Sequence, residues 1–382
     1  MCCNSNKDLL EENSQGVVES KDILLPRFKV ELSKNICSCQ TRQRILDEMK
    51  FGKSFTDHMA SATWSKDEGW HDKKIRAYEN ITLSPAAAIL HYGQEVFEGL
   101  KAYRYSDNSI WTFRPKYNAV RFNMSAERMC MPTFDVQDFI ASIVGLVNVD
   151  KAWVPKKEGS ALYLRPFMYA DEPFLGVRAS NSVQYLCIAS PVGPYFGANV
   201  KDLEIWVDKT FHRAGPGGTG FAKTAGNYAA AMLPQENATS KGFNQVCFLD
   251  SVSNRYLEEL GGMNIFVVYS DGSIATPALT GTILEGSTRS SIITLLEVEG
   301  VTVKQKHIDI DELVDDIRSN KVAEMFACGT AAVIAPIGRL ASEDFDVRIP
   351  SGDVTKHLYN TLTGIQKGVL EDKFGWMYKL SD

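Results

Sequence analysis

Short runs in which apolar and polar residues alternate are interspersed along this chain with longer stretches of helical spacing. Alternation is typical of half-buried strands, and apolar residues three or four positions apart are typical of amphipathic helices. We expect strands at 27–32, 110–115, 183–190 and 203–208, and helices at 44–50, at 135–153 and directly after Gly286. Because the two kinds of segment do not alternate regularly, the pattern predicts an α+β or mixed α/β fold in two domains.

A hairpin and a Pro/Gly-rich segment indicate how the chain is divided. The apolar run from 264 to 279 is interrupted by Asp271-Gly272, a dipeptide typical of a hairpin turn. Residues 1–23 are polar, and we expect a mobile tail there. The segment around 190–202 is rich in Pro and Gly. We therefore expect a smaller N-terminal α/β domain at 24–192, a linker at 193–203 and a larger C-terminal domain at 204–382.

Charge and hydropathy exclude several classes of function. The 382 residues include 41 Lys and Arg against 47 Asp and Glu, a net charge of −6, so no basic balance points to nucleic acid. No apolar run reaches 18 residues, and the first residues lack the apolar core of a signal peptide. The eight cysteines are dispersed without a CxxC pair, and the six histidines form no HxxxH pattern. We expect a cytoplasmic enzyme that contains no metal site and binds neither nucleic acid nor membrane.

Residues 215–220 formally match the glycine pattern of dinucleotide-binding loops. Such a loop closes a strand and opens a helix, but Pro216 follows the first glycine and the next expected helix starts well past Gly220. A phosphate-binding P-loop is excluded as well, because Phe221 follows Gly220 where that motif needs a lysine. We favour a structural loop, and a nucleotide-binding oxidoreductase stays as an alternative.

Lys223 lies between this loop and an alanine-rich helical stretch. A single lysine is usually a solvated surface charge. Here the surrounding glycines would let the backbone approach a bulky planar ligand, and Tyr228 follows five residues later. A lysine whose amine is activated by burial or by its neighbours can form a Schiff base. Lys223 is therefore a candidate nucleophile.

Two further sets of residues could contact an anionic, heterocyclic ligand. Glu258 and Glu259 precede a glycine pair and an apolar strand, so they are either a charged turn or the source of one inward carboxylate. Ser287 and Thr288 begin a helical stretch, where they are either helix caps or phosphate ligands. Gly329-Thr330 and Arg121 could contribute further phosphate contacts.

In combination these segments resemble the pyridoxal-phosphate aminotransferases of the branched-chain amino-acid family, of fold type IV, and in particular the larger branch of that family. The resemblance rests on GGTGFAKTAGNYAAAMLPQ at 217–235 and LEELGGMNIFVV at 257–268. The motifs FTDHM, LHYGQEVFEGLKAYR and ALYLRPFMYADEPFLGV match as well, so the similarity extends from about residue 45 to the C-terminus.

The resemblance implies a role for each candidate residue. Lys223 would bind the aldehyde of pyridoxal 5'-phosphate, Tyr228 its phenolic oxygen and Glu259 its ring nitrogen. The phosphate would be held by Arg121, Ser287, Thr288, Gly329 and Thr330. The substrate would be contacted by Phe51, Tyr92, Phe97, Tyr163, Arg165 and Tyr195, by the backbone of Thr330 and Ala331, and by Val177 from a second subunit of a homodimer.

Two positions depart from the family pattern. The human-type members have a CxxC pair after the Gly-Thr-Ala motif, whereas this chain has Ala332 and Ala335 there, so we expect no thiol regulation at that place. Some relatives have a hydroxyl residue where this chain has Gly262, which removes one possible hydrogen bond near the site.

The implied activity is reversible amino transfer from leucine, isoleucine or valine to 2-oxoglutarate. D-amino-acid aminotransferases and aminodeoxychorismate lyases are the alternatives within the fold type, and the FTDHM, FEGLKAY and LYLRP motifs disfavour both. A non-catalytic structural relative is a third alternative.

Overall fold

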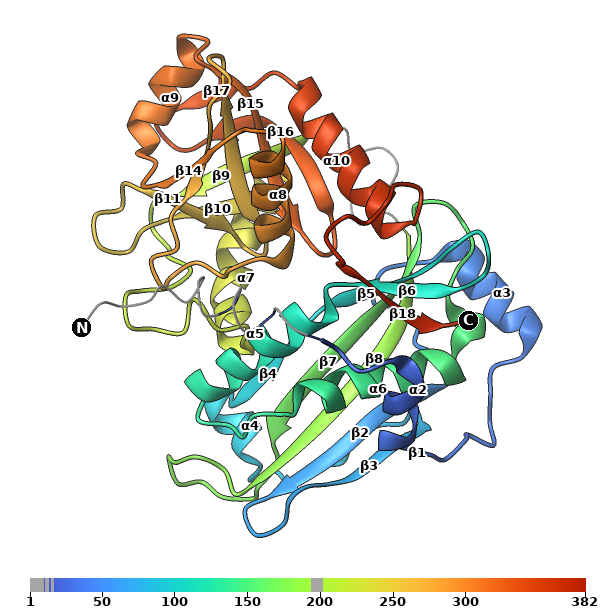
Figure 1. Ribbon diagram of the computed structural model, residues 1–382. Helices are drawn as coiled ribbons and strands as arrows, with labels where there is room; N and C mark the ends of the chain where they lie inside the picture. The colour runs from blue at the N-terminus through green and yellow to red at the C-terminus, as the bar shows by residue number, and fades with distance from the viewer. Residues whose placement is uncertain (1–9, 11–13, 15–16, 194–201) are drawn as a thin grey trace. The chain divides into compact units, whose positions relative to one another are not determined.

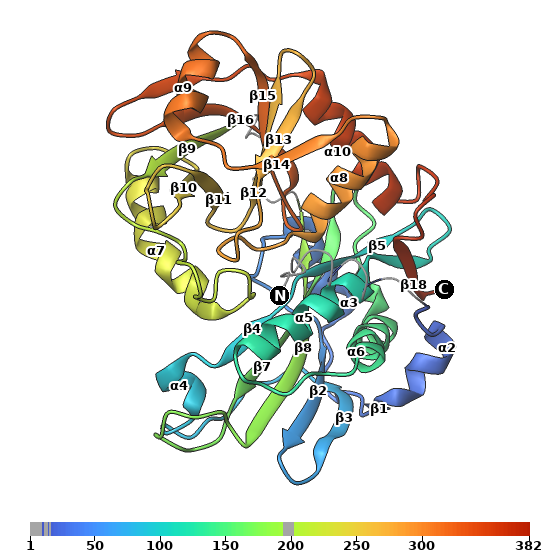
Figure 2. The ribbon, with the colours of Figure 1, turned by 60° about the vertical axis from the view of Figure 1, so that its left-hand side comes forward.

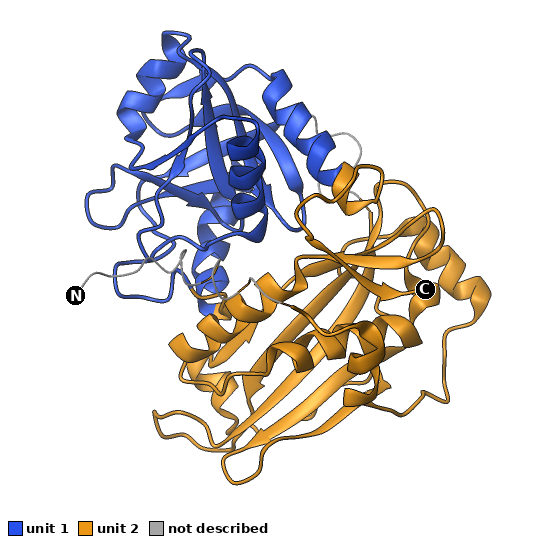
Figure 3. Ribbon diagram, viewed as in Figure 1, with its two compact units in different colours: residues 1–7, 196–221, 226–363 blue, residues 8–195, 222–225, 364–382 orange. Residues whose placement is uncertain are grey.

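The computed structural model describes residues 10, 14, 17–193 and 202–382 (Figure 1). Its chain divides into two compact units (Figure 3). One unit comprises 8–195, 222–225 and 364–382, and we call it the lysine unit because it contains Lys223. The other comprises 1–7, 196–221 and 226–363, and we call it the glutamate unit because it contains Glu259.

The lysine unit is built on one sheet with the strand order β1-β3-β2-β8-β7-β5-β6-β18, and β4 pairs with β7. Its strands are β1 (Lys29–Val30), β2 (His58–Ser65), β3 (Gly69–Ala77), β4 (Glu95–Phe97), β5 (Leu100–Arg104), β6 (Ile110–Phe113), β7 (Ala161–Ala170), β8 (Ser182–Val192) and β18 (Met377–Ser381). Its helices are α2 (Lys21–Leu24), η1 (Leu25–Arg27), α3 (Cys39–Glu48), α4 (Ala88–Tyr92), α5 (Pro115–Arg128), α6 (Val136–Val149) and η2 (Lys151–Trp153).

Helices α5 and α6 lie against the same face of this sheet (Figures 1 and 2). The side chain of Asp135 caps α6 by accepting a hydrogen bond from the backbone N–H of Asp138. The apolar run that follows is buried, and it packs with the inward side chains of the strands into one core that includes Phe122, Phe139 and Tyr185. The sheet and its helices thereby form a rigid base for β4 and β7, which present the candidate site residues.

The glutamate unit has a second sheet with the order β11-β10-β9-β16-β15-β12-β13-β14, and β17 pairs with β16. Its strands are β9 (Leu203–Asp208), β10 (Gln245–Leu249), β11 (Leu257–Leu260), β12 (Asn264–Tyr269), β13 (Ile274–Pro277), β14 (Val303–Lys306), β15 (Val322–Gly329), β16 (Val333–Ala341) and β17 (Asp346–Arg348). Its helices are α7 (Ala225–Ser240), α8 (Ser287–Val298), α9 (Ile310–Arg318) and most of α10 (Asp353–Gln366).

The predicted elements are found in both units. β12 and β13 form the antiparallel hairpin expected at Asp271-Gly272, and Gly272 has the positive φ of 83° that such a turn requires. Residues 215–220 neither close a strand nor open a helix, because β9 ends at Asp208 and α7 begins at Ala225. They form a structural loop, as the sequence predicted.

The domain division differs from the expected one. Residues 364–382 were assigned to a larger C-terminal domain (204–382), but β18 hydrogen-bonds to β6 and thereby belongs to the lysine unit. Residues 222–225 belong to that unit as well, because their backbone bonds to β4 and α5. The unit that contains the N-terminal half (24–192) is consequently the larger of the two. Pairing between distant strands has no local sequence signal, which explains the error.

The expected mobile tail at 1–23 falls largely outside the described residues, and its last part differs from the expectation. Residues 1–9, 11–13 and 15–16 lie outside the described residues, as do 194–201 of the expected linker at 193–203. Residues 17–23 do not form a free tail, because the Glu19 amide donates to Gln137 and its carbonyl accepts from the Tyr378 hydroxyl. Within the described residues no helix is long and apolar enough to cross a membrane, and no group of three or more His, Cys, Asp or Glu could hold a metal ion.

Candidate active site

The backbone of Lys223 is fixed on both sides by the lysine unit. Its N–H donates to the Ser125 hydroxyl at 2.9 Å, and its carbonyl accepts from the N–H of Phe97 at 3.0 Å. The Nζ atom lies 4.9 Å from the centre of the Phe97 ring. A lysine held in this way at a strand edge has a defined direction, unlike the solvated surface lysine that was the alternative interpretation.

The residue that follows strengthens this attachment. The hydroxyl of Thr224 donates to the carbonyl of Glu95, and the N–H of Ala225 donates to the Glu95 carboxylate at 2.9 Å. Burial raises the pKa of the Glu95 carboxyl to about 7, although this hydrogen bond and the charges of Arg165 and Lys223 oppose the rise. Sequence reasoning missed Glu95, because nothing in its local pattern shows that it caps the segment carrying the lysine.

Four of the predicted substrate residues, Phe97 among them, form one cluster in the lysine unit. The Arg165 guanidinium lies 4.7 Å from the Phe97 ring centre and donates to the Tyr163 hydroxyl at 3.0 Å. The ring of Phe51 lies 5.2 Å from the ring of Tyr163. A Cβ at Gly99 would overlap the Tyr163 hydroxyl, so a larger residue there would displace the Tyr163 side chain. The cluster is aromatic with one cationic tip, and it lies beside Lys223.

The other predicted substrate residues are placed differently. Tyr92 ends α4, and its hydroxyl donates to the carbonyl of Leu175 in the β7–β8 loop. Val177 in the same loop is 87% exposed. The polar and ring contacts of Tyr92 within the described residues are with Leu175 and His91, not with the Phe97 cluster. Tyr195 lies outside the described residues.

Arg121 forms a buried ion pair that the sequence did not predict. Its Nε and Nη2 donate to the two carboxylate oxygens of Glu98 at 2.7 and 2.8 Å, and Asn118 donates a further hydrogen bond at 2.8 Å. Burial alone would raise the pKa of Glu98, but the Arg121 charge and these hydrogen bonds outweigh it, so the pKa is lowered. The pair fixes the orientation of the guanidinium expected to bind phosphate.

In the glutamate unit, Glu259 is buried and held by three groups. The Arg213 Nη1 atom lies 2.9 Å from Oε1, the Leu284 N–H donates to the same oxygen at 2.7 Å, and Asn264 donates to Oε2 at 3.4 Å. An adjacent guanidinium and hydrogen-bond donors favour the ionised carboxylate. Glu259 can therefore present a fixed negative charge to a protonated ring nitrogen. Its partner Arg213 was not predicted, because the ion pair joins residues that lie far apart in the sequence.

The start of α8 lies beside this carboxylate. Ser287 and Thr288 are its first two residues, and both are buried. A Cβ on the preceding Gly286 would overlap Oδ1 of Asn264, the residue that also donates to Glu259. The N–H groups and hydroxyls at a helix start favour an anion. Phosphate binding at this helix start is therefore supported by its chemistry.

Tyr228, Gly262 and Gly329 pack together in the same unit. The Tyr228 ring approaches the position of a Cβ on Gly262 to 3.8 Å, and a Cβ on Gly329 would lie 3.4 Å from the Gly262 carbonyl. Thr330 and Ala331 form the turn between β15 and β16 that follows Gly329. Both distances are those of ordinary van der Waals contact, so the Tyr228 ring, Gly262 and Gly329 are neighbours in this part of the unit.

The comparisons with known proteins agree with this chemistry. Residues 95–340 match the model of the family described as amino-transferase class IV. A branched-chain-amino-acid aminotransferase of Mycolicibacterium smegmatis is 46% identical over 361 residues, which cover 93% of this chain and 98% of the relative. Branched-chain-amino-acid aminotransferase 2 of Bacillus subtilis is 46% identical over 333 residues, 86% of this chain and 92% of the relative.

A solved structure matches at the level of the fold and of the sequence. The branched-chain amino acid aminotransferase of Escherichia coli is 26% identical with a TM-score of 0.69, and the match covers 84% of this chain and 100% of that one. Another branched-chain amino acid aminotransferase, solved with pyridoxamine 5'-phosphate, is 25% identical with a TM-score of 0.69, over 84% of this chain and 99% of that one.

Proposed function

The chain belongs to the class IV aminotransferase family, and from this we propose that it is a pyridoxal-phosphate enzyme that exchanges amino groups between branched-chain L-amino acids and 2-oxoglutarate. The relatives that are 46% identical over most of their length are named for that substrate class. The structural observation that carries the proposal is the fixed position of Lys223 beside an aromatic cluster with one arginine.

The residues present fit the chemical groups of pyridoxal 5'-phosphate. The buried helix start at Ser287 and Thr288 suits a phosphate dianion, and we assign further phosphate contacts to Gly329, Thr330 and Arg121. The ion-paired carboxylate of Glu259 suits a protonated ring nitrogen, and we assign the phenolic oxygen to the Tyr228 hydroxyl. Lys223 supplies the amine that binds the aldehyde.

When bound, the cofactor supplies an electron sink that stabilises negative charge on the α-carbon of the amino acid. Glu259 keeps the ring nitrogen protonated, and Arg213 keeps Glu259 ionised. With the cofactor bound and the substrate amine in place, the Lys223 amine would act as general base toward the α-carbon proton and as general acid that delivers this proton to the cofactor's aldehyde carbon. The same residues act in the reverse direction on 2-oxoglutarate, so the kinetics are ping-pong.

Substrate selection is assigned to the Phe97 cluster. The rings of Phe51, Phe97 and Tyr163 suit a branched aliphatic side chain, and each methylene buried there contributes about 0.8 kcal/mol. The Arg165 guanidinium is a polar tip that can receive the side-chain carboxylate of glutamate. We assign the substrate's α-carboxylate to the backbone of Thr330 and Ala331. An apolar wall with one cation accounts for acceptance of both substrates.

We further propose a cytoplasmic homodimer in which Val177 of one subunit reaches the substrate site of the other. The β7–β8 loop exposes Phe174, Leu175 and Val177, which are 40%, 61% and 87% accessible. Apolar side chains exposed next to one another are typical of a surface that another subunit covers. The hydrogen bond between Tyr92 and Leu175 ties α4 to this loop, so we assign Tyr92 to the same surface.

A donor panel under single-turnover conditions tests the proposed substrate class. L-leucine, L-isoleucine and L-valine should each react rapidly with the bound cofactor and change its absorbance, whereas D-alanine and L-aspartate should react slowly. A short aspartate would leave its charge in the apolar part of the cluster, where desolvation is costly. Equal rates for D-alanine and leucine would favour a D-amino-acid aminotransferase instead, and no absorbance change with any donor would exclude a transaminase.

A further inference from the structure

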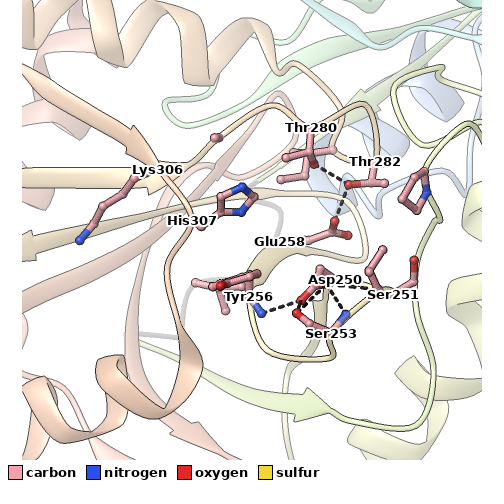
Figure 4. Close-up of a pocket in the computed structure, with 14 residues that line it drawn as sticks. Asp250, Ser251, Ser253, Tyr256, Glu258, Thr280, Thr282, Lys306 and His307 are labelled. Carbon is pink, nitrogen blue, oxygen red and sulfur yellow. Dashed lines mark hydrogen bonds between the residues drawn. The ribbon is translucent and has the colours of Figure 1, made fainter.

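A pocket of about 310 Å³ lies in the glutamate unit, and none of the residues assigned to the cofactor or the substrate lines it (Figure 4). Its apolar lining consists of Pro216, Val252, Leu257, Ala278 and Ile283. Its polar lining consists of Lys306 and His307, the carboxylates of Asp250 and Glu258, and the hydroxyls of Ser251, Ser253, Tyr256, Thr280 and Thr282. A cavity of this size with a mainly apolar wall and a few polar groups is typical of small-molecule sites.

Glu258 is the unsatisfied group of this pocket. Glu258 and Glu259 are consecutive on β11, so their side chains point to opposite faces of the strand. Glu258 is 4% exposed; one carboxylate oxygen accepts a hydrogen bond from the Thr282 hydroxyl, and Oε2 has no hydrogen-bond partner within the described residues. A buried polar atom without a partner costs roughly 1–3 kcal/mol, so its presence calls for an explanation.

Arg213 compensates the Glu258 carboxylate only in part, because its charge lowers the pKa of Glu258 but burial outweighs that effect. Arg213 is committed to Glu259 and to the carbonyls of Gly220 and Thr282. The Lys306 ammonium lies 5.6 Å from the ring centre of Tyr269, and Figure 4 shows it directed away from Glu258. The charges of Glu259, the next residue on β11, and of Asp250, which follows β10, raise the pKa of Glu258 further, and the buried thiol of Cys247 on β10 supplies no positive charge.

Asp250 does not compete for a ligand. Its carboxylate accepts from the backbone N–H groups of residues 252, 253, 255 and 256, and these hydrogen bonds lower its pKa against the effect of burial. The His307 ring packs against the Tyr256 ring with the ring centres 4.8 Å apart and a tilt of 43° between the rings, and the two form an aromatic wall. The pocket therefore combines one unpaired carboxylate with an apolar and aromatic lining.

We propose that this pocket binds a small organic cation, whose planar N–H donors pair with Glu258 and whose apolar body lies against Ile283, Tyr256 and His307. Rotation about the last bond of a glutamate side chain is soft, so a ligand that enters the pocket can reach both carboxylate oxygens. An amidinium or guanidinium suits the site best, because it donates two parallel hydrogen bonds to a carboxylate. Such a ligand is distinct from the amino acids and 2-oxo acids of the proposed reaction.

Three probes of the same shape test the proposal on the holoenzyme by isothermal titration calorimetry. Benzamidine is the cation, benzamide the neutral isostere and benzoate the anion, and none of them is an amino donor. Benzamidine should bind at least ten-fold more tightly than benzamide at pH 8, and benzoate should bind no better than benzamide. Tighter binding of benzoate, or no binding of benzamidine at millimolar concentration, would overturn the proposal.

Titration of Glu258 supplies a second measurement. Burial raises the pKa of this carboxyl to about 7, with Glu259 adding to the rise, so the ionised fraction grows about ten-fold between pH 6 and pH 8. Because the cation pairs with the ionised form, benzamidine affinity should rise by about the same factor over that range. The rise should disappear in Glu258→Gln and persist in His307→Gln, which removes the imidazole of the aromatic wall.

A blocking variant guards against a folding defect in Glu258→Gln. Ala278→Phe fills the pocket from a partly exposed position and leaves Glu258 unchanged. It should abolish benzamidine binding while the transaminase reaction persists, because the assigned cofactor and substrate residues do not include Ala278. Benzamidine binding that survives both variants would place the ligand elsewhere and refute the proposed site.

Discussion

The Arg213 guanidinium lies 2.9 Å from the carboxylate of Glu259, while the adjacent Glu258 carboxylate has Thr282 as its hydrogen-bond donor. Two consecutive glutamates on one strand thus have opposite electrostatic settings. The Arg213 guanidinium favours the ionised form of Glu259, whereas burial raises the pKa of Glu258 to about 7, so that this carboxyl is only partly ionised near neutral pH. This difference decides which of them can stabilise positive charge on a ligand ring, and it leads to the first prediction.

Glu259→Gln should reduce kcat/KM for leucine on the order of 100-fold, because it removes the fixed charge assigned to the ring nitrogen. Glu258→Gln is the matched control on the same strand and should cost much less. Steady-state kinetics with both variants measure the difference. Comparable losses, or a larger loss in Glu258→Gln, would show that the wrong carboxylate was assigned.

Lys223→Ala should abolish transamination and leave no cofactor covalently bound after borohydride reduction, because no other amine takes its assigned role. The matched control is Lys241→Ala. Lys241 follows the last residue of α7, and its ammonium lies over the Trp206 ring. Peptide mass spectrometry of the reduced wild-type protein should place the cofactor on Lys223. A modified peptide that contains another lysine would contradict the assignment.

Arg121→Ala should destabilise the protein by about 3–5 kcal/mol, because it leaves the fully buried carboxylate of Glu98 without its cation. Glu98→Gln combined with Arg121→Met should cost less than Arg121→Ala alone, because no charge is then left unpaired. Urea denaturation of the apoprotein measures both values without any contribution from phosphate binding. Equal losses in the single and double variants would show that the pair is not coupled.

Glu258 should make the wild-type protein less stable as the pH rises. Its folded pKa of about 7 lies above the unfolded value near 4.5, so the folded state holds a proton that the unfolded state has lost between these values. The free energy of unfolding should therefore fall by about 2 kcal/mol across this window. This is less than the full difference in pKa would give, because solvent in the pocket screens part of the effect. Urea denaturation at pH 5 and pH 8 should show a smaller fall in Glu258→Gln, and an equal fall would exclude this carboxyl as the cause.

Local sequence determined most of the secondary structure and the family. The structure confirms the predicted hairpin at Asp271-Gly272 and the predicted helices at α6 and α8. These elements could be predicted because alternation and helical spacing depend on residues close together in the chain. The motifs around Lys223 and Glu259 identified a family that the comparisons confirm. The roles assigned to the individual site residues remain predictions.

Only the tertiary structure decided which residues far apart in the sequence form ion pairs and which strands join the same sheet. The ion pair of Arg213 with Glu259, the pairing of Arg121 with Glu98 and the addition of β18 to the sheet of the N-terminal half all join residues without a common local pattern. The pocket behind Glu258 is formed by separate stretches of chain, from Pro216 to His307. Such contacts depend on how the elements pack, and packing brings side chains together from positions that the chain alone leaves independent of one another.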